Sequence, residues 1–197
     1  MDALEALVTR RSTRNYKPDP VEQEKLEKIL EAGRQAPSGG NHQTSHFFVI
    51  RNRKVLDRLI EMTEKAFSGM EITENTYESM KHSIAASKKG GYVFCYNAPV
   101  LIVVANRKEY GNNIADCACA IENMMVAANA LDLGSCWINQ LKWLNEEPEI
   151  VEYLRGFGMK EDERVYGAVI IGVPATDSGL PNRNLMSIKG NEVTWID

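Results

Sequence analysis

The chain has 197 residues, with 23 Lys and Arg against 27 Asp and Glu, and a formal net charge of -4. A chain of this length buries a sizeable core as one domain, and its acidic balance argues against a nucleic-acid-binding protein, which normally carries a basic excess. No apolar run approaches the ~20 residues of a membrane span and no secretory leader pattern precedes the first predicted helix, so we expect a cytoplasmic protein without a membrane partner.

The cysteines and histidines form no metal-ligand pattern. Cys95, Cys117, Cys119 and Cys136 lie inside apolar segments and lack the spacing of a disulfide framework. Cys117 and Cys119 are two positions apart on a predicted helix, so they project to nearly opposite sides and do not hold one ion together. We therefore expect no metal site.

Two helices are expected near the start of the chain. The first covers residues 2–10 and has Leu4, Leu7 and Val8 on its apolar side. The second covers residues 21–36 after a proline-containing break, and its apolar positions follow the helical period.

A basic stretch, Arg10-Arg11-Ser12-Thr13-Arg14, connects these helices. If it is extended, Arg10, Ser12 and Arg14 point to one side and span roughly 13 Å, because successive side chains of an extended chain alternate. This row suits a long anionic ligand such as a phosphorylated flavin, since the arginine fork matches phosphate and carboxylate oxygens bidentately. The alternative for the stretch by itself is a basic loop exposed to solvent.

A loop, a strand and a helix come next. The loop Pro37-Ser38-Gly39-Gly40-Asn41 ends the second helix and can bring backbone N–H groups close to a ligand. Residues 46–50 are predicted to form a strand and residues 54–67 a helix. The polar segment 68–91 is interpreted either as a mobile cover over a pocket or as a pair of surface helices.

The remaining chain alternates strands and helices. Apolar runs predict strands over residues 99–105, 133–138 and 165–173. A helix is expected over residues 113–131 and another over residues 147–157. The first of these is apolar on nearly every side, which predicts burial in a core or against a second subunit. The alternation implies an α/β or α+β fold with a sheet of four or five strands.

Two details of this part of the chain bear on assembly. Asp116 and Asn123 are seven positions apart and share a helix face. We expect both side chains to be buried with hydrogen-bond partners; the alternative is that they form the exposed edge of the helix. The tail from residue 182 to the end has too much apolar content for plain disorder. It is expected to add a strand or to lie on a neighbouring subunit.

Several separated stretches match one family in order and spacing. They are Arg10-Arg11-Ser12-Thr13-Arg14, Ala36-Pro37-Ser38-Gly39-Gly40-Asn41, Asn97-Ala98-Pro99, the helix with Asp116 and Asn123, Leu133-Gly134-Ser135-Cys136-Trp137-Ile138, and Ile171-Gly172-Val173-Pro174. On these stretches the chain resembles the FMN-dependent nitroreductase family over nearly its full length.

The resemblance implies an α+β fold in which helices flank a central, mostly antiparallel sheet of four to five strands. It also implies that residues 1–197 form a single FMN-binding domain, with 68–91 as the candidate mobile cover. Two such chains form an intertwined homodimer with two FMN sites in the interface, each built from both subunits.

The resemblance also implies a set of cofactor-binding residues. In the family, the phosphate end is bound by residues that correspond to Arg10, Ser12 and Arg183, the ribityl chain by Arg11, and the pyrimidine ring near N1 and O2 by Arg14. The flavin of the partner subunit is contacted by the loop residues Pro37, Ser38, Gly39 and Asn41. The isoalloxazine lies along Trp137, Ile138, Asn139 and Gln140, where a backbone N–H approaches N5. The sequence departs from the family where Asn139-Gln140 replaces the usual Glu-Gly, and where Thr44 and Ser45 follow Gln43 instead of Pro-Trp. These departures leave open the charge beside N5 and the shape of the pocket wall.

The implied activity is that of an FMN-dependent oxidoreductase. Hydride passes from NAD(P)H to flavin N5 and then to a nitroaromatic, quinone or similar conjugated acceptor by a ping-pong mechanism, the hard chemistry being the flavin's. Arg14 would stabilise the negative charge of reduced FMN, and no side chain stands out as a catalytic acid or base. The alternatives are a flavoenzyme of the same fold with another reaction (enone reduction, dehalogenation or dehydrogenation) and a flavin-binding protein without turnover.

Overall fold

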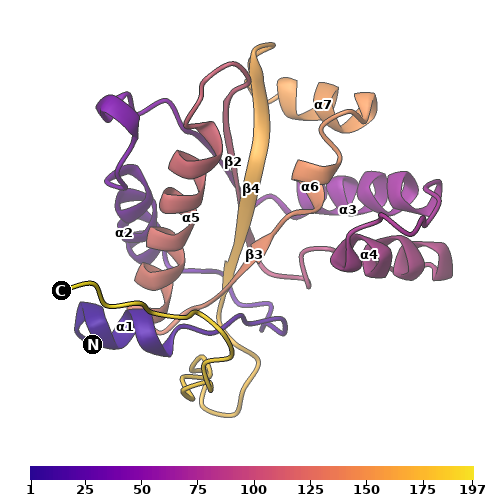
Figure 1. Cartoon of the computed structure of the whole chain (residues 1–197). Coiled ribbons are helices and arrows are strands. Elements are labelled where there is room, and N and C mark those ends of the chain that lie inside the picture. The colour runs from indigo at the N-terminus through magenta and orange to yellow at the C-terminus, as the bar shows by residue number, and fades with distance from the viewer.

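The computed structural model describes residues 1–197 and has an α+β architecture built on one antiparallel sheet (Figure 1). The strands are β1 (His46–Ile50), β2 (Val100–Arg107), β3 (Gly134–Ile138) and β4 (Glu163–Gly172), in the spatial order β1-β2-β4-β3. Every neighbouring pair is antiparallel. The predicted strands and the antiparallel sheet are therefore confirmed, with four strands in one chain.

Seven α-helices and one short 3-10 turn surround the sheet. They are α1 (Ala3–Thr9), α2 (Gln23–Arg34), the 3-10 turn Gly39–Asn41, α3 (Arg53–Ser68), α4 (Glu78–Lys89), α5 (Asn113–Ala130), α6 (Gln140–Trp143) and α7 (Pro148–Arg155). The five predicted helices are confirmed to within a few residues. The segment 68–91 contains one helix and not the pair that was the alternative to a cover, and α6 was not predicted.

Local side-chain chemistry sets several helix ends. The Asp2 carboxylate accepts a hydrogen bond from the backbone N–H of Glu5 (2.9 Å) at the start of α1, and Asn52 caps α3 by accepting from the N–H of Lys54 (3.0 Å). Each such cap stabilises a helix by about 1 kcal/mol. Helix α4 ends at Gly90, whose φ of +83° is a left-handed conformation that glycine adopts without strain.

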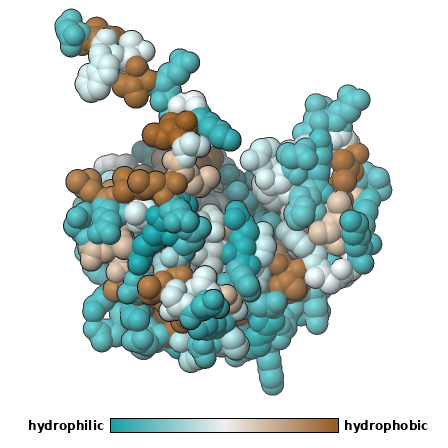
Figure 2. All heavy atoms as spheres, turned by 90° about the horizontal axis from the view of Figure 1, so that it is seen from below, coloured by the Kyte–Doolittle hydropathy of each residue, from teal (hydrophilic) through white to brown (hydrophobic).

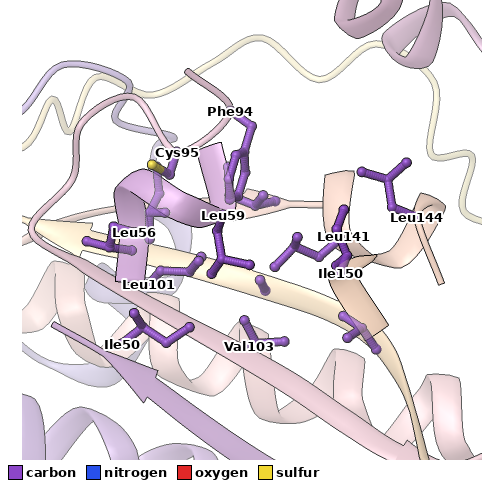
Figure 3. Packing of buried hydrophobic residues seen from close by; sticks show 14 of the residues in the cluster. Ile50, Leu56, Leu59, Phe94, Cys95, Leu101, Val103, Leu141, Leu144 and Ile150 are labelled. Atoms are coloured by element: carbon purple, nitrogen blue, oxygen red, sulfur yellow. The ribbon is translucent and has the colours of Figure 1, made fainter. Parts of the chain in front are cut away.

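The sheet separates two apolar cores (Figure 1). Along β2, Leu101 and Val103 lie in the core under α3, α6 and α7, which Figure 3 shows in close-up. Ile102 and Val104 lie in the other core, under α2 and α5. Because both faces of the sheet are covered, alternate positions of β2 are all buried, which explains its continuous apolar sequence.

Helix α5 packs closely against α2 on its inner side but leaves an apolar outer side. A Cβ built on Gly33 of α2 would lie 2.7 Å from Cγ of Met124, so this contact requires glycine. On the outer side Ile114 and Cys119 are exposed. One chain therefore buries α5 on one side only.

The apolar side predicted for α1 is not buried in the single chain. Leu4, Leu7 and Val8 are 75%, 49% and 59% exposed, and Ala6 is the buried residue of this helix. Helix α1 rests on α5 through the small Ala6 side chain, so its larger apolar side chains face outward.

The C-terminal tail forms no strand within its own chain. It projects from the body as a narrow extension on which apolar residues alternate with polar ones (Figure 2). The exposed apolar residues of the tail are Leu185, Met186, Ile188, Val193, Trp195 and Ile196. The added strand is therefore not found in one chain. None of the helices has the length and apolar content needed to cross a membrane.

Candidate functional site

The segment of residues 10–14 runs beside the free edge of β3. Ser12 forms a parallel bridge with Ser135, and the N–H of Thr13 donates to the Ser135 carbonyl (2.9 Å). A Cβ on Gly134 would come within 2.7 Å of the Thr13 side chain, so glycine permits this close approach. The basic stretch is thus held against the sheet at Ser12 and Thr13.

The backbone is hydrogen-bonded on both sides of Arg14, at Thr13 and at Lys17, whereas the Arg14 side chain has no hydrogen-bond or ion-pair partner. After it, the N–H of Lys17 donates to the Val173 carbonyl (2.9 Å), and the Tyr16 hydroxyl donates to the Thr13 carbonyl (2.7 Å). Burial raises the pKa of Tyr16, while the Arg14 charge acts in the opposite direction. The Arg14 side chain is exposed and makes no hydrogen bond or ion pair, so its guanidinium is available to a ligand.

Asn129, on the last turn of α5, joins Arg183 to the end of α1. Its amide Nδ2 donates to the Ala6 carbonyl (2.9 Å) and to the Thr9 hydroxyl (3.0 Å), while its Oδ1 accepts from Nε of Arg183 (3.2 Å). Arg183 also pairs with Asp132 (2.7 Å). Sequence reasoning missed this role of Asn129; the signal was an amide inside an otherwise apolar helix.

Arg10 and Arg11 follow the end of α1, and the Arg10 side chain reaches toward the middle of α5, where Glu122 lies. Nε of Arg10 is 3.4 Å from Glu122, and Nε of Arg11 donates to the Asn184 carbonyl (2.7 Å). Arg11 and Arg183 therefore meet where the C-terminal tail passes the end of α5, while the Arg10 side chain points toward the middle of that helix. The Arg10–Glu122 ion pair is partly exposed, and pairs of this kind contribute about 0–1 kcal/mol to stability.

The far end of β3 presents backbone and amide groups. Nε1 of Trp137 donates to Oδ1 of Asn139 (2.8 Å), which leaves the Asn139 amide N–H groups as donors. The Ile138 side chain is buried in the core, so this residue offers a ligand only its backbone. Gln140 opens α6, where a first-turn N–H has no acceptor within the helix. The extended backbone from Ser135 to Asn139 spans about 13 Å at 3.3 Å per residue, which equals the length predicted for the row of Arg10, Ser12 and Arg14.

The Pro37–Asn41 loop is fixed to the opposite end of α5. The N–H of Gly39 donates to Oδ1 of Asp116 (3.1 Å), and the Tyr110 hydroxyl lies 3.0 Å from both the Gly39 carbonyl and Oδ2 of Asp116. A Cβ at Gly39 would meet the Asn112 amide nitrogen at 1.9 Å, so a larger residue would require the Asn112 side chain to move. Asp116 is buried and paired, which confirms the prediction for this residue.

One chain does not bring the loop and the arginines together. Asn123, half-buried, also has the partner expected of it, since its Nδ2 donates to the Ala32 carbonyl (3.0 Å). The loop is anchored at Asp116 and Arg183 at Asn129, thirteen residues further along α5, which is about 20 Å at 1.5 Å per residue. The predicted site residues thus form two separate groups within a single chain.

The thiols and histidines do not form a metal centre in this structure. No group of three or more His, Cys, Asp or Glu side chains is placed to hold a metal ion. Cys117 is buried and Cys119 exposed, so they point apart as predicted. Burial raises the pKa of Cys95 and of Cys117 to about 11, which keeps both thiols neutral.

Comparison with known proteins agrees on one family. The model of the nitroreductase family matches residues 7–173. A protein of Methanothermobacter thermautotrophicus named "Putative NADH dehydrogenase/NAD(P)H nitroreductase" is 31% identical over 183 residues, which cover 91% of this chain and 81% of that protein.

Two solved structures extend the agreement to the fold. A nitroreductase with bound FMN from Bacteroides fragilis is 35% identical, with a TM-score of 0.87 and coverage of 100% of both chains. A nitroreductase with bound FMN from Desulfitobacterium hafniense, at 22% identity, has a TM-score of 0.80 over 100% of both chains and supports the fold alone.

Proposed function

The chain belongs to the nitroreductase family, and from this premise we propose that it is an NAD(P)H-dependent oxidoreductase that works with bound FMN. The family match spans residues 7–173, and the Bacteroides fragilis relative that binds FMN has the same fold at 35% identity. In this chain the proposal is carried by the residues along the outer edge of β3. Arg10, Arg11 and Arg183 lie near the start of this strand, and Asn139 and Gln140 follow its end.

The residues along this edge have the chemistry that FMN requires. Arg10 and Arg183 would bind the phosphate together with the Ser12 hydroxyl, and Arg11 would lie beside the ribityl chain. Arg14 has a free guanidinium for the pyrimidine oxygen and N1, where a fixed positive charge stabilises negative charge. FMN, when bound, would supply two-electron redox chemistry between a reduced nicotinamide and a second substrate, and the donor and the acceptor would use the site in turn.

We further propose that the protein is a homodimer in which the partner's Pro37–Asn41 loop completes each site. Within one chain this loop is attached at the opposite end of α5 from Arg183. The exposed apolar sides of α1 and α5 and the exposed apolar tail form a surface of the kind that marks protein–protein contacts. A second copy of the chain would bury all three.

The acceptor proposed for the site is a conjugated molecule such as a quinone or a nitroaromatic. No metal centre and no paired catalytic acid and base lie among the site residues, so the protein's part is to orient the acceptor and exclude water. An absorbance spectrum of the purified protein, followed by anaerobic titration with NADH and NADPH, tests the cofactor and the donor. Initial rates with a quinone, a nitroaromatic and an enone then test the acceptor, and converging double-reciprocal lines would contradict the ping-pong order.

A further inference from the structure

Three side chains from separate elements meet beside the far end of β3. Nε2 of Gln140, at the start of α6, donates to the Tyr92 hydroxyl (2.8 Å) and lies 3.3 Å from Oγ of Ser83 on α4. The two hydroxyls are 2.9 Å apart. Ser83 is fully buried, and Gln140 and Tyr92 are half-buried. Helix α4 is thus hydrogen-bonded to the residue that follows the ring-binding end of β3.

Donor and acceptor assignment is consistent throughout this network. The Ser83 hydroxyl donates to the Ser79 carbonyl (3.2 Å), so the Tyr92 hydroxyl is the group that donates between the two. Burial raises the pKa of Tyr92, so the phenol keeps its proton at neutral pH. The backbone N–H of Tyr92 donates to the Glu64 carboxylate of α3 (2.7 Å), which fixes the tyrosine from the other side.

Apart from this network, α4 is held by its packing along α3 and by two apolar side chains, the buried Ile84 and the partly buried Met80. Its buried residues are Ser83, Ile84 and Ser87, so Ile84 is the one large apolar side chain that it buries. Its ion pair between Lys88 and Glu71 is 3.5 Å long and exposed. A helix with so little buried apolar surface opens locally at low free energy, so its position depends on the polar network. Tyr77, which contacts Trp143 of α6 edge to face, supplies a further contact through its ring.

We infer that Tyr92 and Ser83 are positioning residues that hold α4 against Gln140 and thereby limit the size of the conjugated acceptor that the site admits. This inference rests on the proposed function, which places the flavin ring along Trp137 and Gln140. With the network intact, α4 borders the space above that end of the ring. When the network opens, α4 moves away and two-ring acceptors gain access.

The test uses the FMN-loaded protein and four variants. Tyr92→Phe and Ser83→Ala each remove a hydroxyl of the network, and their double variant removes both. Tyr77→Phe is the matched control, because it removes a phenol oxygen from the same segment that makes no hydrogen bond. Hydrogen exchange of the peptide covering α4 is measured with and without FMN. The ratio of kcat/KM for menadione to that for 1,4-benzoquinone measures acceptor selectivity.

The inference predicts that both single variants exchange at least threefold faster in α4 and raise the selectivity ratio at least threefold, while Tyr77→Phe matches the wild type. The double variant should change no more than the larger single variant, because both hydroxyls act in one network. Wild-type exchange in α4, an unchanged selectivity ratio, or additive effects in the double variant would each overturn it. A wild-type protein that binds no FMN and oxidises no NAD(P)H would instead refute the proposed function, and the exchange of α4 would still report on the network.

Discussion

Replacing Arg14 with alanine separates ligand binding from folding more cleanly than any other single change. The guanidinium is exposed and has no partner in the free chain, so its loss should alter the free energy of unfolding by no more than about 0.5 kcal/mol. A charge-assisted hydrogen bond to a ligand contributes about 1.5–3 kcal/mol. We therefore expect Arg14→Ala to weaken FMN binding roughly 10- to 150-fold.

The same variant should make bound FMN harder to reduce. If Arg14 stabilises the reduced, negatively charged flavin more than the oxidised form by about 1.4 kcal/mol, the two-electron midpoint potential falls by about 30 mV on its removal. FMN affinity is measured by fluorescence quenching during titration of the apoprotein, and the potential by equilibration with a reference dye. Arg14→Lys should recover part of the affinity, since it restores the charge without the fork.

Arg164→Ala is the control for these measurements. Arg164 is a partly exposed arginine that pairs with Glu146 near the start of β4, away from the proposed site. If Arg14→Ala and Arg164→Ala had the same FMN affinity and the same midpoint potential, the placement of Arg14 at the pyrimidine ring would be wrong.

Three further predictions follow from burial and exposure. Asn129→Ala should lower the free energy of unfolding by about 2–4 kcal/mol in urea titrations, because it leaves polar groups of α1 and Arg183 without partners; a loss below 0.5 kcal/mol would contradict this. Burial raises the pKa values of Cys95 and Cys117 from 9.0 to about 11. The free energy of unfolding should therefore be constant below pH 9 and fall between pH 9 and 11, because the thiols of the unfolded chain ionise first. The loss should reach about 2.7 kcal/mol per thiol. Urea midpoints at pH 8, 9 and 10 measure this, and a midpoint that rises with pH would refute it. Sedimentation should give twice the chain mass of 22.1 kDa, and removing the tail from residue 181 onward should weaken the dimer; a monomer at micromolar concentration would refute the shared site.

Sequence reasoning named some residues of the candidate site and missed others, for physical reasons that differ between the two groups. The basic stretch and the glycine loop were singled out because guanidinium groups and a glycine-rich turn are local features, although the stretch by itself also fitted an exposed basic loop until the family resemblance favoured a binding role. Asn129, Tyr92 and Ser83 carry no such local signal. Their roles arise from contacts with residues that are 9 to 123 positions away along the chain.

The sequence alone predicted the four strands and five of the seven α-helices, and through the family resemblance it predicted the antiparallel sheet and a set of candidate FMN-binding residues. These features depend on short-range periodicity, turn chemistry and side-chain type, all of which are local. The tertiary structure decided that Arg183 and the Pro37–Asn41 loop are attached near opposite ends of α5, and that α1 and the tail present their apolar side chains outward. These features depend on how far apart α5 holds its two ends, a distance that local patterns do not encode.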